Sequence, residues 1–217
     1  MTEIIPAVIA QNFNELEEKI KKVEPDVDWV QLDIMDGRFV NESTWPYAEP
    51  GKNNPAELKN LKTKVNLEAH LMIAQPIETV EDWIDSGVKR IIFHYEATDQ
   101  PEEVIEKIKK SNLEVGLAIN PATPIEVLDE YLADLDLILI MTVEPGRGGQ
   151  ELLPETLAKI KKLRQSYPNL KIEADGGVNL KTALEVIRAG ANILAVGSVI
   201  FNSKNIKETI NQMKLCP

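Results

Sequence analysis

Short apolar segments alternate with segments of helical periodicity along the whole chain, and this alternation limits the possible folds more than any other feature. We predict strands at residues 4–10, 29–35, 65–72, 90–96, 114–120, 137–143, 171–175 and 192–197. Apolar residues at helical spacing predict helices around 13–23, 55–61, from 76, and around 104–108, 125–132, 157–163, 183–187 and 206–213, with Asn12 as the first N-cap. Eight such units imply parallel strands and right-handed crossovers.

Closing these eight strands into a barrel leaves no exposed sheet edge. The sequence therefore predicts a single α/β domain over residues 1–217, a (β/α)8 TIM barrel near the short end of the size range of that fold. An open doubly wound sheet is the alternative, but we can place neither its glycine fingerprint nor a sheet edge. The irregular stretch at 41–54 reads as a long loop rather than a domain boundary.

Charge and the N-terminal segment exclude several classes of function. The net charge of −11 and pI near 4.8 argue against nucleic acid as a partner, because a phosphate backbone requires clustered lysine and arginine. The first residues lack the basic region of a signal peptide, and no apolar run is long enough to span a membrane. The lone cysteine, Cys216, excludes an internal disulfide. We therefore expect a cytoplasmic protein that does not bind a membrane.

Polar residues interrupt four of the predicted strands near their carboxyl ends. The pairs are Gln31 and Asp33, Glu68 and His70, His94 and Glu96, and Glu173 and Asp175, and they include both histidines of the chain. Alternate positions such as Leu32, Ala69 and Ala174 are apolar, as a face packed under helices requires, so the pairs should point into the barrel. One inward carboxylate or histidine is usually structural, but four pairs at the mouth where barrel enzymes place reactive groups favour a site.

The loops after predicted strands six, seven and eight are rich in glycine. They read EPGRGGQ at 144–150, DGGVN at 175–179 and GS at 197–198. Turns use glycine routinely, but backbone N–H groups in neighbouring glycine loops can cradle an anion, and barrels of this kind commonly bind phosphate after strands seven and eight. We therefore expect a phosphate cradle.

A carboxylate pair beside a phosphate anchor suits proton transfer at a carbon next to a carbonyl. One group removes a proton from one face and the other returns one to the opposite face, so that a stereocentre inverts. A metal ion held by histidine and carboxylates can stabilise the enediolate that forms. Met35, Met72 and Met141 fall at similar depth on their strands. Each alone is typical core filler, but together they could cap such an intermediate.

Seven segments resemble the ribulose-phosphate 3-epimerase family over almost the whole chain. They are LDIMDG at 32–37, AHLM at 69–72, FHYEA at 93–97, GLAINP at 116–121, MTVEPGRGGQ at 141–150, DGGVN at 175–179 and AGAN at 189–192. The resemblance implies an isomerase of carbohydrate metabolism that inverts C3 of D-ribulose 5-phosphate to give D-xylulose 5-phosphate. It also implies that Asp33 and Asp175 are the two acid/base groups.

The resemblance assigns further roles by position. It implies a divalent metal (Zn, Mn, Fe or Mg) on Asp33, His70 and Asp175, with Gln31 as a further candidate ligand and His70 also near the substrate. It implies an intermediate cap of Met35, Met72 and Met141, and substrate or phosphate contacts at Ala7, Gly146, Arg147, Gly148, Gly149, Gly176, Gly177, Gly197 and Ser198. The partner is then a small sugar phosphate, and the family commonly forms homo-oligomers.

Three positions depart from the family pattern. Gln31 replaces a metal-ligand histidine, Ala7 replaces a serine close to the substrate, and Arg147 replaces an aromatic residue of the phosphate-side loop. The loop at 38–51 is also unusual, so we expect a remodelled mouth. Three protein ligands can still hold a catalytic metal, and a glutamine oxygen would favour manganese or magnesium over zinc. We expect a weaker or different metal, or none.

Two alternative functions follow from these departures. One is an epimerase of a related ketose phosphate such as allulose 6-phosphate, because the altered loop and Arg147 lie where the substrate would be recognised. The other is a catalytically silent sugar-phosphate-binding paralogue. A related decarboxylase ranks last, because that chemistry needs a lysine between acidic residues and the segment DIMD at 33–36 has none.

Overall fold

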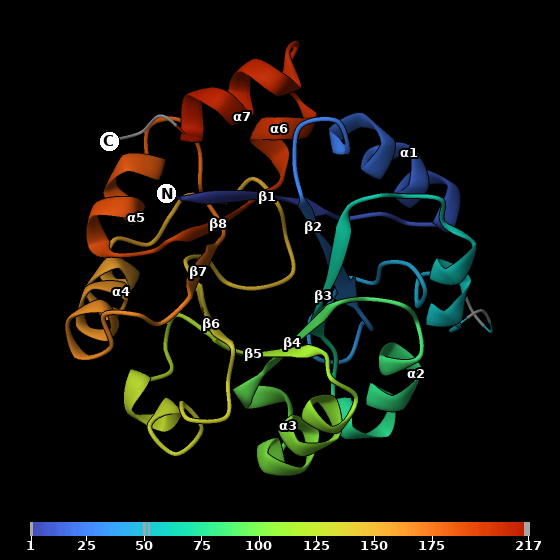
Figure 1. Ribbon diagram of the computed structural model, residues 1–217, viewed down its shortest axis with the longest axis horizontal. Helices are drawn as coiled ribbons and strands as arrows, with labels where there is room; N and C mark the ends of the chain where they lie inside the picture. The colour runs from blue at the N-terminus through green and yellow to red at the C-terminus, as the bar shows by residue number, and fades with distance from the viewer. Residues whose placement is uncertain (1, 50, 52, 215–217) are drawn as a thin grey trace.

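Eight parallel strands close into a barrel in which each strand pairs with the next along the chain and β8 pairs with β1 (Figure 1). The structure is a computed structural model that describes residues 2–49, 51 and 53–214, so Cys216 lies outside the described residues. The strands are β1 (Glu3–Val8), β2 (Trp29–Met35), β3 (Asn66–Met72), β4 (Arg90–His94), β5 (Glu114–Ile119), β6 (Leu137–Met141), β7 (Ile172–Asp175) and β8 (Ile193–Val196). The predicted TIM barrel is confirmed.

Helices surround the barrel on its outside (Figure 1). They are α1 (Phe13–Val23), α2 (Val80–Ile84), α3 (Pro101–Lys110), α4 (Glu155–Ser166), α5 (Ala183–Ala189), α6 (Ser198–Phe201) and α7 (Ile206–Lys214). In α1 the periodic residues Leu16, Ile20 and Val23 are buried, and the predicted N-cap Asn12 accepts a hydrogen bond from the backbone of Glu15 at 3.0 Å. Burial of one apolar stripe against the strands is thus what fixes each longer helix.

Two predicted helices are wrong, because they are short 3₁₀ segments. The segment after β2 is η1 (Pro55–Asn60) and the segment after β5 is η4 (Ile125–Leu128), while η2 (Pro76–Glu78) precedes α2 and η3 (Tyr95–Ala97) follows β4. Each apolar run here is too short to supply the successive turns that an α-helix needs to be stable. The short helix α6 was not predicted, since four residues carry no period.

The interior of the barrel has an apolar side and a polar side. Inward residues of β4 to β6, among them Ile92, Leu139 and Met141, form one buried apolar cluster. The buried polar residues inside the barrel are Gln31, Asp33, Glu68, His70, Glu173 and Asp175 of β2, β3 and β7, together with Arg90 and His94 of β4. The outward residues of β2 pack in the main core under the helices, as their alternation predicted. The polar side is where a site can form.

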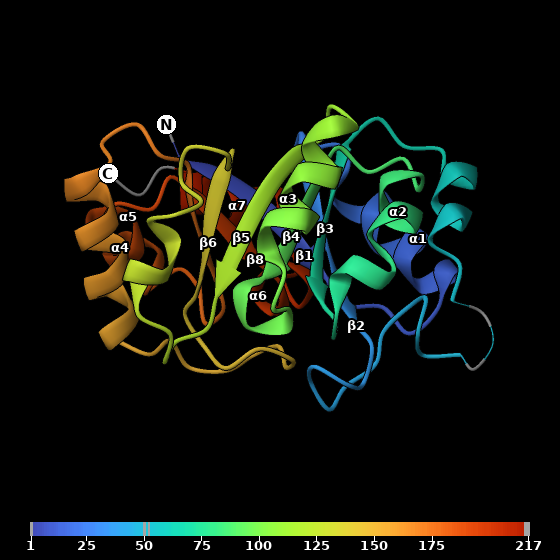
Figure 2. The ribbon, with the colours of Figure 1, turned by 90° about the horizontal axis from the view of Figure 1, so that it is seen from below.

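Long loops leave the barrel at the carboxyl ends of the strands. The loops after β2 and β6 extend from the same end of the molecule (Figure 2). The carboxylate of Asp36 anchors the first of them by accepting hydrogen bonds from the backbone N–H groups of Arg38, Phe39 and Ala74.

No helix within the described part of the chain is long and apolar enough to cross a membrane.

Candidate active site

Three strands bring one amide, one imidazole and two carboxylates together at the polar side of the mouth. The register pairs Asp33 of β2 with His70 of β3, and Nδ1 of His70 lies 3.3 Å from Asp33 Oδ1 and 3.2 Å from Asp175 Oδ2. Nε2 of Gln31 donates hydrogen bonds of 2.7 Å to the same two oxygens and lies 3.4 Å from Nδ1 of His70. The predicted convergence of these strand ends is therefore present.

Two buried threonine hydroxyls fix the strand ends that carry the aspartates. Thr44 Oγ1 donates to the carbonyl of Asp33 at 2.8 Å, and Thr142 Oγ1 donates to the carbonyl of Asp175 at 2.9 Å. Thr44 and Thr142 are 1% and 0% exposed, so water does not compete for these hydrogen bonds. Each carboxylate thus projects from a backbone that a side chain of another segment holds in place.

Burial and mutual charge set the protonation of this cluster. Burial raises the pKa of Asp33, the charge of Asp175 raises it further, and hydrogen bonds from His70 and Gln31 act in the opposite direction. Burial alone would lower the pKa of His70, but hydrogen bonds to Asp175 and Asp33 raise it to about 9. The cluster can therefore hold protons close to neutral pH, as acid/base chemistry requires.

A second imidazole supports His70 from the side away from the carboxylates. Nε2 of His94 lies 2.9 Å from Nε2 of His70, with the two rings stacked at 5.1 Å between centroids. Burial lowers the pKa of His94, whose Nδ1 lies 3.5 Å from Oε2 of Glu96. Glu96 lies on η3 rather than on a strand and accepts from the backbone of Asn120 at 2.8 Å. His94 and Glu96 thus orient His70 and do not line the mouth.

The other predicted carboxylates lie deeper in the barrel. Glu68 and Glu173 precede His70 and Asp175 by two residues, and both are fully buried. Nη1 of Arg90 lies 2.5 Å from Oε2 of Glu68. Burial, together with the charge of Glu68, raises the pKa of Glu173 well above its usual value. These groups form a buried charge cluster below the site; Arg90, which sequence analysis did not single out, is its cation.

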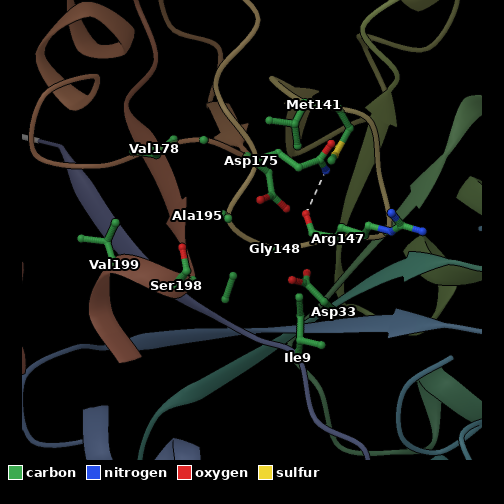
Figure 3. A pocket seen from close by; sticks show the side chains of 18 of the residues that line it. Ile9, Asp33, Met141, Arg147, Gly148, Asp175, Val178, Ala195, Ser198 and Val199 are labelled. Atoms are coloured by element: carbon green, nitrogen blue, oxygen red, sulfur yellow. Dashed lines mark hydrogen bonds between the residues drawn. The ribbon is translucent and has the colours of Figure 1, made fainter. Parts of the chain in front are cut away.

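A cavity of about 450 Å³ opens above the two aspartates. Figure 3 shows Asp33 and Asp175 both pointing into it, while His70 and Gln31 are not among its lining residues. Met35, Met72 and Met141 line the cavity beside the carboxylates, because Met35 pairs with Met72 and Met141 with Asp175 in the strand register. An intermediate formed at the carboxylates would contact this uncharged surface.

The glycine loops line the same cavity, as do the other predicted contact positions. These are Ala7, Gly146, Arg147, Gly148, Gly149, Gly176, Gly177, Gly197 and Ser198. Gly177 has φ +64°, and a Cβ there would lie 2.4 Å from the backbone nitrogen of Leu152, so no side chain fits. Exposed backbone N–H groups without side chains are what an anion cradle needs.

Two cationic side chains lie at the rim of the cavity. The guanidinium of Arg147 is directed away from the aspartates (Figure 3), and its Nε lies 2.5 Å from Oε1 of Glu42 in the loop after β2. Lys19 of α1 also lines the cavity and binds the carbonyl of Ile9 at 2.7 Å. Sequence analysis missed Lys19, although its place three residues after the buried Leu16 puts it at the edge of the core face.

The donor set fits a divalent cation. One ligand atom from each of Asp33, His70 and Asp175 can be chosen so that all three lie within 4.8 Å of one another. Two carboxylates and an imidazole are ligands that catalytic metals accept, and three protein ligands leave room for a substrate oxygen. The amide of Gln31 occupies the space between the two carboxylates and competes with an ion for them.

Fold and site together define a (β/α)8-barrel enzyme in which two carboxylates, held by a buried imidazole, face a cavity lined by glycine loops. The sequence model of the ribulose-phosphate 3 epimerase family matches residues 3–201. The chain belongs to the ribulose-phosphate 3-epimerase family, whose members are isomerases.

Curated relatives agree with this assignment, and solved structures agree with the fold. The ribulose-phosphate 3-epimerase of Schizosaccharomyces pombe is 36% identical over 214 residues, covering 98% of this chain and 92% of the relative. That of Bacillus subtilis is 34% identical over 221 residues, covering 99% of each chain. A mutant tryptophan synthase alpha-subunit from Pyrococcus furiosus superposes with a TM-score of 0.73 at 15% identity, covering 100% of this chain and 99% of its own. The 3-hexulose-6-phosphate synthase of Salmonella typhimurium superposes with a TM-score of 0.70 at 16% identity, covering 100% of this chain and 98% of its own. At such low identity both structures show the fold alone.

Proposed function

We propose that this chain interconverts D-ribulose 5-phosphate and D-xylulose 5-phosphate by inverting C3. The observation that carries the proposal is the pair of carboxylates, Asp33 from β2 and Asp175 from β7, that enter one cavity beside the glycine loops. Family membership supports the same reaction, because the relatives of the chain carry this name. The loops at Gly176, Gly177 and Gly197 would hold the phosphate and so place C3 between the carboxylates.

The two aspartates would act in turn. In one direction a carboxylate takes the proton from C3, the C3–H electron pair moves to the C2 carbonyl to give an enediolate, and the other carboxyl group delivers a proton to the opposite face of C3. The raised pKa of Asp33 suits it to carry the delivered proton. Met35, Met72 and Met141 keep water from the planar intermediate.

A divalent cation held by Asp33, His70 and Asp175 would supply positive charge next to the enediolate oxygens. The chain itself contributes the orientation of that ligand set. His94 holds the His70 ring through its Nε2 at 2.9 Å, and Thr44 and Thr142 hold the strand ends of the aspartates. Supporting contacts of this kind keep ligands and proton-transfer groups in one geometry.

Deuterium exchange tests the assignment of the two aspartates. The protein is incubated in D2O with ribulose 5-phosphate or with xylulose 5-phosphate, and deuterium at C3 is followed by NMR. Each epimer presents its C3 proton to one carboxylate, so Asp33→Asn should abolish exchange into one epimer and Asp175→Asn exchange into the other, while both abolish inversion. Asp134→Asn, on the surface beside Lys109, is the matched control and should leave both deuterium exchange and inversion unchanged.

Two results would overturn the proposal. Absence of exchange by the wild-type protein with either pentulose phosphate and with supplied metal would exclude this substrate. Exchange into both epimers by either variant would exclude the two-carboxylate mechanism. Allulose 6-phosphate belongs in the same assay, because Arg147 and the loop after β2 alter the rim where a longer sugar phosphate would extend.

A further inference from the structure

Gln31 has a place at the centre of the acid/base cluster that an ordinary buried glutamine does not have. Its Nε2 is 2.7 Å from both Asp33 Oδ1 and Asp175 Oδ2 and 3.4 Å from His70 Nδ1. These are the three residues whose atoms could hold a metal ion. The two hydrogens of the amide nitrogen are thus both used on carboxylates, and the nitrogen lies where a cation shared by this set would lie.

The other end of the same amide has no partner. Gln31 is fully buried, and its Oε1 accepts no hydrogen bond from any residue that the structure describes. A buried acceptor without a donor is unfavourable. The oxygen and nitrogen of an amide have nearly the same size and shape, so a half-turn about the last side-chain torsion exchanges them without moving any neighbour. The side chain therefore has two orientations that fill the same space.

The charge between the carboxylates decides which orientation is favoured. With no cation, an oxygen placed between two carboxylates would be repelled, whereas the NH2 group donates to both. With a divalent cation between them, the NH2 group would face positive charge and the amide oxygen would be a suitable ligand, because hard cations bind neutral carbonyl oxygens well.

We propose that Gln31 is a two-orientation amide whose NH2 group bridges Asp33 and Asp175 in the metal-free protein and whose Oε1 turns toward a divalent cation when one binds. The inference rests on the proposed function, since it concerns the same pair of carboxylates. It gives the metal-free site a neutral bridge that keeps the two acid/base groups apart and oriented. It also makes Mn²⁺ and Mg²⁺ the preferred ions, with a weak affinity, because each binding event breaks two amide–carboxylate hydrogen bonds.

Titration with Mn²⁺ distinguishes a Gln31 side chain that binds the metal from one that only occupies the metal site. Mn²⁺ binding to the metal-stripped protein is measured by calorimetry and by electron paramagnetic resonance for wild type, Gln31→Leu and, as the control, Gln165→Leu on the exposed face of α4. Loss of a ligand should weaken Mn²⁺ binding by Gln31→Leu by at least about tenfold, while Gln165→Leu should bind Mn²⁺ as wild type does. Equal or tighter binding by Gln31→Leu, or no binding by wild type, would overturn the proposal.

Side-chain amide NMR observes the reorientation directly. The ¹H–¹⁵N signals of the Gln31 NH2 group are assigned by their absence from Gln31→Glu, which is also available if Gln31→Leu does not fold. Saturating Mg²⁺ should move both proton signals away from their carboxylate-bonded positions, while the signals of the exposed Gln165 amide on α4 stay unchanged. Unmoved Gln31 signals in the Mg²⁺-loaded protein would overturn the proposal. Neither measurement uses a sugar phosphate, so an absence of C3 exchange would refute the proposed function and leave this inference standing.

Discussion

Replacing Arg90 by methionine tests how the polar side of the barrel remains stable. Arg90 is 1% exposed, and its guanidinium contacts Glu68 at 2.5 Å and Glu114 at 2.6 Å and lies 4.1 Å from the ring centroid of Trp29. Burial raises the pKa of Glu68 and Arg90 lowers it. Methionine keeps much of the volume and the contact with the aromatic ring, so the substitution removes mainly the charge.

The expected loss follows from the three contacts. Breaking a buried ion pair and leaving one charge behind costs about 3 to 5 kcal/mol, and the Glu68 contact is of this kind because both partners are buried. The side chain of Glu114 is 34% exposed, and a partly exposed pair adds little. We therefore expect Arg90→Met to lower the free energy of unfolding by about 4 kcal/mol and Tm by roughly 10 °C.

Urea denaturation at several pH values measures the loss and identifies its cause. In Arg90→Met the pKa of Glu68 in the folded state lies further above its unfolded value, so the stability of the variant should fall as pH rises through that folded pKa and recover toward acid pH. The double variant Arg90→Met with Glu68→Gln should recover at least half of the loss at neutral pH. A loss below about 1 kcal/mol, or a double variant no more stable than the single one, would refute the electrostatic account.

Four further substitutions test other parts of the site. Thr142→Val removes the hydroxyl that holds the Asp175 carbonyl. Urea denaturation should show a free energy of unfolding lower by about 1 to 2 kcal/mol, and steady-state kinetics should show a lower kcat with little change in KM. Gly177→Ala forces a side chain into a position with φ +64° and no free space, so KM for ribulose 5-phosphate should rise at least about tenfold; an unchanged KM would place the phosphate elsewhere. Glu42→Gln frees the exposed Arg147 from its ion pair, so KM and its dependence on salt should change without a measurable change in thermal stability. Arg147→Ala removes the cation, so it should change KM in the direction opposite to the change caused by Glu42→Gln.

The barrel could be predicted because periodicity and length both point to it. Each of the eight strands begins within one residue and ends within two residues of its predicted position, since short β-branched runs bounded by polar residues define strands well. The segments after β2 and β5 could not be distinguished from α-helices by one apolar face alone. Whether such a segment forms an α-helix or a 3₁₀ turn depends on packing that the sequence does not display.

Part of the site could be predicted for a similar reason. Parity along a strand places Asp33, His70 and Asp175 inside the barrel, and closure of the barrel brings them together. The alternation of side chains along a strand does not show how far a residue lies from the mouth of the barrel. Glu68 lies about 6 to 7 Å below His70 along the strand and pairs with Arg90 instead of facing the mouth. The alternation also does not predict the hydrogen bond between Gln31 and Asp175, which lie 144 positions apart in the sequence, because the spacing of these two side chains depends on the strand register.

The carboxylates and the glycine loops that line the cavity belong to different kinds of segment. Asp33 and Asp175 are inward residues of strands that pair with a neighbour on both sides, whereas Gly146 to Gly149 lie in a loop whose ion pair with the β2 loop, Arg147 with Glu42, is at the surface. Sequence and length can therefore vary in these loops while the spacing of the carboxylates stays constant. If the chain has the proposed function, a library randomised at 38–49 and 147 would explore sugar phosphates of other lengths and retain the same proton-transfer step, so the chain would serve as a scaffold for evolving new epimerases.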